Sequence, residues 1–271
     1  MQETKPTVCL FCRGPGPFNT VEHIVPESLG NDSDILEGLV CDKCQNYLGR
    51  MVEKAALEKT PFAFWRSFLG IKTKKGKLPS VQLSPPAKGR IPATHPLTDE
   101  IGFTAHQDGT TSVDIDTPSL VHHILTEEKQ SFKLVLSPWH LNIMGRFLGK
   151  IGLEYLALFD ANLALDSQFD ALRTFVREGS TNYLWPIFAG QQGQLEELKG
   201  PLVDRGEFFE QEVECYRYSL GVTSENEHVF AFSVGVDLML ICLSHRRPEN
   251  KFTTFVQGVA LNCVHYPDGS W

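Results

Sequence analysis

The chain has 271 residues, 42% of them hydrophobic, which is enough for one large domain or two ordinary ones. Its net charge of −8 and isoelectric point near 5.6 exclude a protein that is basic throughout, but leave room for a local basic surface. No signal-peptide pattern opens the chain, and the most apolar run, 234–243, is too short and polar to span a bilayer. We therefore expect a cytoplasmic protein with no membrane partner.

Two C-x-x-C pairs stand in the first 58 residues, Cys9 with Cys12 and Cys41 with Cys44. Each pair places two thiolates on one tight turn, and two such turns complete a tetrahedral four-sulfur site. The pattern predicts zinc, and with four protein ligands the zinc has no open position for water, so its predicted role is structural. The other cysteines stand among apolar residues and are predicted to be buried thiols: Cys215, Cys242 and Cys263.

A helix is predicted directly after the second pair, from about Lys43 to Leu57. On one face of this helix, Asn46, Arg50 and Lys54 follow each other at a spacing of four residues. A polar side chain in line with two cations suits contact with a nucleic-acid backbone, and it equally suits an ordinary solvated face. The apolar stripe that should face the core consists of Tyr47, Leu48, Met51, Val52 and Ala55.

The next segment, 59–98, contains cations but no acidic residue, and prolines interrupt it. We interpret it as an extended basic linker or arm. The aromatic residues at its start suit base stacking: Phe62, Phe64 and Trp65. The alternative is a linker that only keeps the protein soluble. The aromatic residues could equally dock the linker onto the first module. The cations are Lys59, Arg66, Lys72, Lys74, Lys75, Lys77, Lys88 and Arg90.

The remaining segment, 99–271, alternates helical and strand patterns, so its predicted class is α+β. Asp108-Gly109 predicts a β-hairpin turn between strands at 103–107 and 110–115. A helix should start at Ser137-Pro138, with Ser137 as N-cap, and reach about Leu158. A second helix is predicted from Gln168 to Glu178, before Gly179, and an antiparallel meander from strands at 212–222, 228–234, 238–245 and 253–264.

The residues between the two cysteine pairs carry the functional signal. They include Glu22-His23 followed by Pro26 and Gly30, and the second pair continues into Gln45-Asn46. In this order and spacing, the elements resemble the HNH (ββα-metal) endonuclease family, in the branch with a C-x-x-C…C-x-x-C zinc site. The resemblance covers residues 9 to about 57. It implies a small zinc-stapled ββα-metal module (1–58) in front of a larger α+β domain, and metal-dependent hydrolysis of phosphodiester bonds.

Carried over by position, the resemblance implies that His23 is the general base and that Glu22 binds the catalytic metal. A second ligand comes from the helix after the cysteines, and we favour Asn46, with Gln45 as the alternative. Imidazole is a suitable base near neutral pH, and oxygen ligands suit Mg²⁺ or Mn²⁺. The middle residue of the motif stays open among Asn31, Asp34 and Glu37.

The implied partner is nucleic acid, double-stranded DNA rather than RNA, and a homodimer would let so small a module cut both strands. A nuclease in front of a larger body resembles bacterial or phage proteins whose body selects a target or trigger, which suggests a defence role. Two alternatives remain: a non-catalytic zinc knuckle that binds nucleic acid or protein, and a structural zinc that holds an interaction domain. The predicted phosphate contacts are Lys43, Arg50, Lys54, Lys72, Lys74 and Lys75.

Overall fold

The computed structural model describes residues 8–31, 33–68, 81–83, 101–105, 111–115, 138–179, 184–191, 216–235, 237–246 and 262–264. Within these ranges helices combine with antiparallel sheets, so the predicted α+β class is confirmed. No helix in this part of the chain is both long and apolar enough to cross a membrane.

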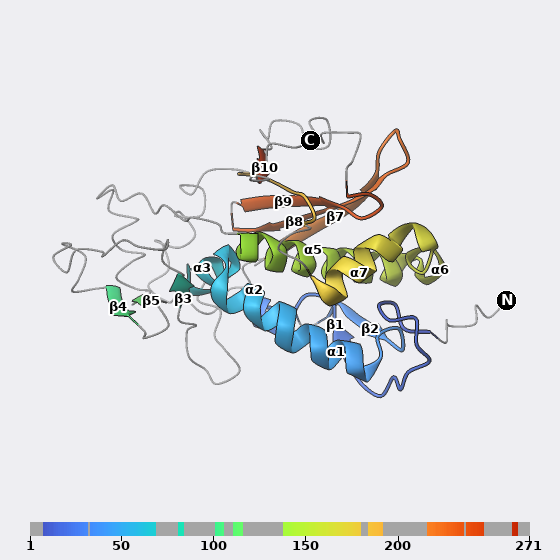
Figure 1. Ribbon diagram of the computed structural model, residues 1–271, viewed down its shortest axis with the longest axis horizontal. Helices are drawn as coiled ribbons and strands as arrows, with labels where there is room; N and C mark the ends of the chain where they lie inside the picture. Colours follow the sequence, from blue (N-terminus) through green and yellow to red (C-terminus); the bar gives the residue numbers. More distant parts are fainter. Residues whose placement is uncertain are drawn as a thin grey trace.

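The N-terminal module is a short β-hairpin followed by a long helix, the ββα arrangement that the sequence predicts. The two strands pair antiparallel with His23 opposite Ile35, and the long helix follows the second cysteine pair (Figure 1). The elements are β1 (Val21–His23), the 3-10 turn η1 (Glu27–Leu29), β2 (Ile35–Glu37), α1 (Asp42–Leu48), the π-helical segment η2 (Gly49–Glu53) and α2 (Lys54–Lys59).

The π-helical segment η2 changes which residues of the long helix face the core. A π-helix takes its hydrogen bonds from i to i+5, so its turns are wider than those of an α-helix. Met51, which α-helical spacing places in the apolar stripe, is 45% exposed, and this part of the prediction is wrong. Leu57 is buried as well, and the other buried side chains recur at every fourth residue: Cys44, Leu48, Val52 and Ala56.

The start of the predicted basic arm is a helix, α3 (Pro61–Phe68), and Val81–Leu83 form strand β3. The interpretation of this stretch as extended is therefore wrong for α3, where the chain is helical. The reason is apolar burial: Phe62 and Trp65 are almost fully buried and pack into the core, so neither is available for base stacking. The side chain of Phe64 lies outside the described residues.

Arg66, counted among the cations of the arm, serves the fold instead. It is 3% exposed, and its guanidinium donates to the carbonyl oxygens of Ser28 at 2.9 Å and Leu57 at 3.0 Å. These bonds join α3 to η1 and to the end of the module's helix. Lys72, Lys74 and Lys75 lie outside the described residues.

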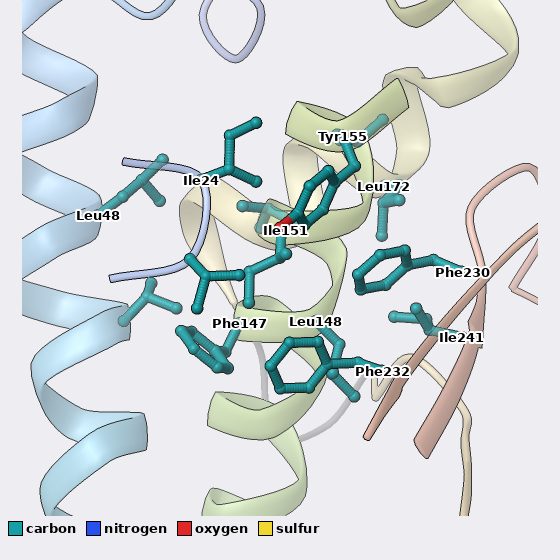
Figure 2. Close-up of a cluster of buried hydrophobic side chains, with 14 of the residues drawn as sticks. Ile24, Leu48, Phe147, Leu148, Ile151, Tyr155, Leu172, Phe230, Phe232 and Ile241 are labelled. Carbon is teal, nitrogen blue, oxygen red and sulfur yellow. The ribbon is translucent and has the colours of Figure 1, made fainter. Parts of the chain in front are cut away.

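Helix α5 (Pro138–Phe159) is the predicted long helix and runs through the centre of the molecule (Figure 1). The module's helix lies along one side of it and the C-terminal sheet along the other, so its side chains are buried from His140 to Ala157 (Figure 2). A Cβ atom at Gly149 would meet Leu172 at 2.9 Å, and one at Gly152 would meet Leu243 at 2.8 Å. These glycines weaken the helical pattern, but they let the neighbouring elements approach. The predicted N-cap, Ser137, lies outside the described residues.

The second predicted helix is also present. It consists of the 3-10 turn η3 (Ser167–Phe169) and α7 (Asp170–Glu178), and the short helix α6 (Ala161–Ala164) precedes it. The helix ends at Gly179, whose φ of 63° is a backbone conformation that glycine adopts without strain.

The C-terminal sheet has five described strands in the order β10-β6-β9-β8-β7, and all neighbours are antiparallel. The meander is confirmed for β7, β8 and β9, but not for the last strand, because β6 lies between β9 and β10. Sequence reasoning missed β6, a five-residue strand directly after Pro186 that is too short to show a clear period. The strands are β6 (Ile187–Gln191), β7 (Tyr216–Val222), β8 (His228–Val234), β9 (Asp237–Cys242) and β10 (Asn262–Val264).

A smaller sheet has the order β3-β5-β4 and contains the predicted hairpin. Its strands β4 (Ile101–Ala105) and β5 (Thr111–Ile115) are antiparallel, with Ala105 opposite Thr111. The turn residues Asp108 and Gly109 lie outside the described residues.

One hydrophobic core joins the N-terminal module to the C-terminal body (Figure 2). The ring of Phe62 packs edge-on against Phe147 of α5 and Phe232 of β8, with centroid distances of 5.0 and 6.2 Å. The indole N–H of Trp65 donates to Asp237 Oδ2 at 2.7 Å. The same core contains Ile24 and Leu48 of the module and Ile151 of α5, so the described parts of 1–58 and 99–271 are packed against each other and are not held together by a linker alone.

Replacing Phe62 by alanine should test this shared core. The side chain is fully buried between two aromatic rings, so its loss should lower the free energy of unfolding by about 3–5 kcal/mol. Chemical denaturation measures the change, and Phe159→Ala is the control because Phe159 is 69% exposed. The control should stay within about 0.5 kcal/mol of wild type. Equal effects of the two substitutions would contradict the packing.

Candidate functional site

The two cysteine pairs come together as the sequence predicts. The four Sγ atoms of Cys9, Cys12, Cys41 and Cys44 lie within 4.8 Å of one another. Sulfur atoms bound to one tetrahedral zinc at about 2.3 Å stand roughly 3.8 Å apart, and Cys12 Sγ and Cys41 Sγ are 3.6 Å apart. The cluster is therefore positioned to form a four-cysteine zinc site.

Polar groups around the cluster favour a thiolate at Cys9, whereas burial raises the pKa of Cys41. Backbone N–H groups donate to sulfur, from Cys41 to Cys9 Sγ at 3.3 Å and from Gly14 to Cys12 Sγ at 3.4 Å. A hydrogen bond from the Cys44 thiol lowers the pKa of Cys9 to about 4, and backbone N–H groups act in the same direction. Thiolates held by N–H donors are the form in which cysteine binds zinc.

Polar side chains hold the hairpin in place. Asp42, at the start of α1, accepts hydrogen bonds from the backbone and side chains of Asn19 and Thr20, just before β1. Asn31, which is 3% exposed, donates to the carbonyl oxygens of Val25 and Asp34 and accepts from the N–H of Asp34. Of the three candidates for the middle residue of the motif, Asn31 therefore has the contacts that order the loop after His23.

The other two candidates for the middle position face elsewhere. The carboxylate of Asp34 accepts hydrogen bonds from the hydroxyl groups of Tyr155 and Tyr216, which belong to the C-terminal body. Glu37 is exposed on β2.

Strand β1 directs Glu22 and His23 to opposite sides, because successive side chains of a strand alternate. The side chain of His23 is 32% exposed, and its Nε2 lies 3.4 Å from Glu27 Oε1. Glu22 is only 4% exposed, and its Oε1 lies 2.8 Å from Lys150 Nζ. The imidazole can therefore meet solvent or a substrate, whereas the carboxylate is turned inward.

The wide turns of η2 arrange the long helix into rows of four-residue spacing. We name Gln45, Gly49 and Glu53 the half-buried row, since all three are of intermediate exposure. Gln45 Nε2 donates to the carbonyl oxygen of Val21 at 2.6 Å, so this row faces β1. The exposed row consists of Asn46, Arg50 and Lys54. Asn46 turns back on its own helix and donates to the Asp42 carbonyl oxygen at 2.8 Å.

Several buried oxygen atoms around this site accept no hydrogen bond from the described residues, among them Glu154 Oε1. Two others belong to β1 and α1: Glu22 Oε2 and Gln45 Oε1. Burial raises the pKa of the Glu22 carboxyl above its ordinary value, against the opposing charge of Lys150. Unpaired buried acceptors are uncommon in proteins, and each calls for a partner. Both atoms belong to residues that the family resemblance identifies as candidate metal ligands, and oxygen donors of this kind fit a divalent cation such as Mg²⁺.

Helix α5 brings a lysine and a glutamate to the site that sequence reasoning missed. Lys150 Nζ lies 2.8 Å from Glu22, 2.7 Å from Glu53 and 2.7 Å from Glu154. Burial alone would lower the pKa of Lys150, but the charges of the three carboxylates outweigh it and raise the pKa well above its ordinary value. The available signal was a Lys-Glu pair at i, i+4 within an otherwise apolar helix.

Comparison with protein families supports the assignment. Residues 9–61, about a fifth of the chain, match a family model described as HNH endonuclease. The resemblance seen in the cysteine pairs and the Glu-His sequence is confirmed, and it extends to the start of α3. The N-terminal part of this chain is thus similar to HNH endonucleases, with four cysteines positioned to form a zinc site, and at the family level a nuclease-type function is supported. Searches of curated proteins and of solved structures found no match.

Proposed function

We propose that this protein is a divalent-metal-dependent endonuclease that hydrolyses phosphodiester bonds, with double-stranded DNA as its main substrate. The observation that carries the proposal is the pair of unpaired buried oxygens, Glu22 Oε2 and Gln45 Oε1, beside the accessible His23 of a matched HNH segment. A metal-binding group and a base, carried by adjacent residues of one strand in a zinc-stapled frame, are the parts that phosphodiester hydrolysis requires.

His23 would take the proton from the attacking water. Its imidazole is partly exposed, and the nearby Glu27 carboxylate lies on its Nε2 side at 3.4 Å. Glu22 and Gln45 would hold Mg²⁺ or Mn²⁺, which when bound neutralises charge on the phosphate and the leaving oxygen. Asn31 keeps the loop after β1 in one conformation through its buried hydrogen bonds, and so keeps His23 in place.

The exposed side of the long helix supplies the phosphate contacts of the proposal. Lys43, Arg50 and Lys54 are all exposed, and Arg50 and Lys54 continue the row that starts at Asn46. Cations spaced along one helix face can track a nucleic-acid backbone without reading its sequence. Two copies of the chain would cut both strands of a duplex, in the cytoplasm where reduced cysteines favour zinc over disulfides.

The first experiment is a cleavage assay with zinc-loaded protein. Supercoiled plasmid, single-stranded DNA and RNA are each incubated with Mg²⁺, with Mn²⁺ or with neither. No chelator is added, so that the structural zinc stays in place. Nicked or linear plasmid only when Mg²⁺ or Mn²⁺ is present supports the proposal. If all three substrates survive with either metal, the non-catalytic zinc knuckle becomes the better account, and salt-sensitive binding without cleavage would establish it.

Two substitutions on neighbouring residues should identify the helix ligand. Gln45→Ala removes the unpaired buried oxygen beside β1, and we expect it to weaken both cleavage and Mn²⁺ binding by at least about tenfold. Asn46→Ala removes an exposed amide that bonds only its own helix among the described residues, and we expect less than about a twofold change. Titration calorimetry with Mn²⁺ measures the binding. The reverse order of effects would assign the metal to Asn46.

A further inference from the structure

The ammonium group of Lys150 sits at the centre of a buried polar cluster that joins three elements. Its Nζ contacts Glu22 of β1, Glu53 of η2 and Glu154 of α5 itself at 2.7–2.8 Å, and the Ile24 carbonyl oxygen at 3.3 Å. The side chains of Lys150 and Glu154 are fully buried, and that of Glu53 is 17% exposed. Four oxygen atoms thus surround a single nitrogen, one from β1 and one from Ile24 directly after it.

The two carboxylate oxygens of Glu22 have different contacts in this cluster. Lys150 engages Oε1 of that carboxylate, whereas no described residue donates to Oε2. One oxygen is therefore anchored and the other is left for a cation. Lys150 itself has further anchors, because Glu154 lies one turn along the same helix and Glu53 approaches from the half-buried row. It can hold the carboxylate of Glu22 without depending on it.

Buried ion pairs of this kind contribute little net stability to a fold. Removing several charged groups from water costs free energy that their mutual attraction only partly returns, and apolar residues often replace such clusters without loss. The cluster also holds three carboxyl groups for one ammonium group, so its charges are not balanced within it. Its position directly behind the Glu22-His23 strand suggests a function for it.

We propose that Lys150 is a positioning residue of the metal site: its ammonium group fixes Glu22 so that the second carboxylate oxygen can bind the divalent cation. The inference rests on the proposed nuclease function, and it extends the site beyond the matched residues 9–61. Helix α5, which carries Lys150, also packs against the C-terminal sheet. The body thereby contributes to the metal site instead of merely adjoining the module.

The test is Mn²⁺ binding to the full-length, zinc-loaded chain by titration calorimetry, since metal affinity is separate from catalysis. Lys150→Met keeps the length of the side chain but removes its charge and its donors. We expect it to weaken Mn²⁺ binding about ten- to a hundredfold, the usual effect of losing a group that orients a metal ligand.

Arg146→Met is the matched structural control. Arg146 lies one turn before Lys150 on α5 and is also buried, and it bonds the Val176 and Arg177 carbonyl oxygens and the Tyr47 hydroxyl without touching Glu22. We expect it to lower the melting temperature but to leave Mn²⁺ affinity within about twofold of wild type. This difference separates positioning from a general loss of stability.

The outcomes distinguish the two proposals. If wild type binds Mn²⁺ and Lys150→Met binds it equally well or more tightly, the positioning role is overturned while the nuclease proposal stands. If wild type and Gln45→Ala alike fail to bind Mn²⁺, the metal-dependent function itself fails. Should Lys150→Met not fold, the double variant Lys150→Met, Glu154→Gln removes a neighbouring buried charge as well, and the same loss of affinity is expected from it.

Discussion

Substitution of His23 by alanine is expected to lower the rate of plasmid cleavage by about 10²–10⁴-fold, the usual contribution of a general base. The imidazole is the one group of the Glu22-His23 pair that meets solvent, whereas the carboxylate is turned toward Lys150. Single-turnover cleavage with saturating Mg²⁺ measures the effect without interference from product release. The melting temperature should change little, because the side chain is partly exposed and lies outside the core.

The control for this prediction is metal binding. His23→Ala should retain the Mn²⁺ affinity of wild type, because the proposed ligand atoms are Glu22 Oε2 and Gln45 Oε1. A variant that binds Mn²⁺ normally but does not cut would assign His23 to proton transfer. Cleavage at the wild-type rate would instead remove His23 from the mechanism, and loss of both properties would make it a metal ligand.

Loss of the zinc site should have the largest effect on stability. Structural zinc in small modules contributes on the order of 10 kcal/mol of folding free energy. The expected result of Cys44→Ser, or of a chelator that strips zinc, is an unfolded N-terminal module and a melting temperature well below that of the zinc-loaded chain. The effect should reach the body as well, because Leu48 and Ile24 of the module pack in the same core as Ile151 of α5 (Figure 2).

Two measurements check this prediction together: the zinc content of the protein, and its thermal melting monitored by circular dichroism. Cys242→Ala is the matched control, because Cys242 is a buried thiol in the C-terminal sheet and far from the cluster in the fold. That variant should keep one zinc per chain and lose only the modest stability that a small cavity costs. A zinc-free chain that melts at the wild-type temperature would show that the metal does not stabilise the fold.

Much of the local structure could be predicted because it depends on residues close together in the chain. The C-x-x-C pairs specify a zinc geometry through their own spacing, and Asp108-Gly109 between two strand patterns specifies a hairpin. The helix that ends at Glu178 carries its stop signal in the next residue, Gly179. The structure confirms these elements with small changes at their ends.

The choice between Asn46 and Gln45 shows where local reasoning stops. Both are polar, both follow Cys44, and an α-helical repeat gives no reason to prefer the residue that faces β1. The tertiary contacts separate the two side chains, since Gln45 donates to the Val21 carbonyl oxygen of β1 whereas Asn46 donates to its own helix.

The basic arm shows the same limit for a different reason. Its charge and prolines suggested extended chain, and the aromatic residues suggested stacking on bases. In the structure Phe62 and Trp65 bury their rings in the core, and Arg66 satisfies two backbone carbonyl groups. Burial of apolar area outweighed the local composition, and only a partner surface supplied by α5 and the C-terminal sheet made that burial possible.

The sequence alone therefore determined the zinc frame, the Glu-His pair and the class of the fold, because each depends on residue types at short, regular spacing. The tertiary structure decided which oxygen atoms face the site and which cation lies behind them. Lys150 and Glu22 stand far apart in the chain, and the contact between them exists only because α5 packs against the module's helix. No local sequence pattern predicts this contact, because the packing of the hydrophobic core brings the two charges together.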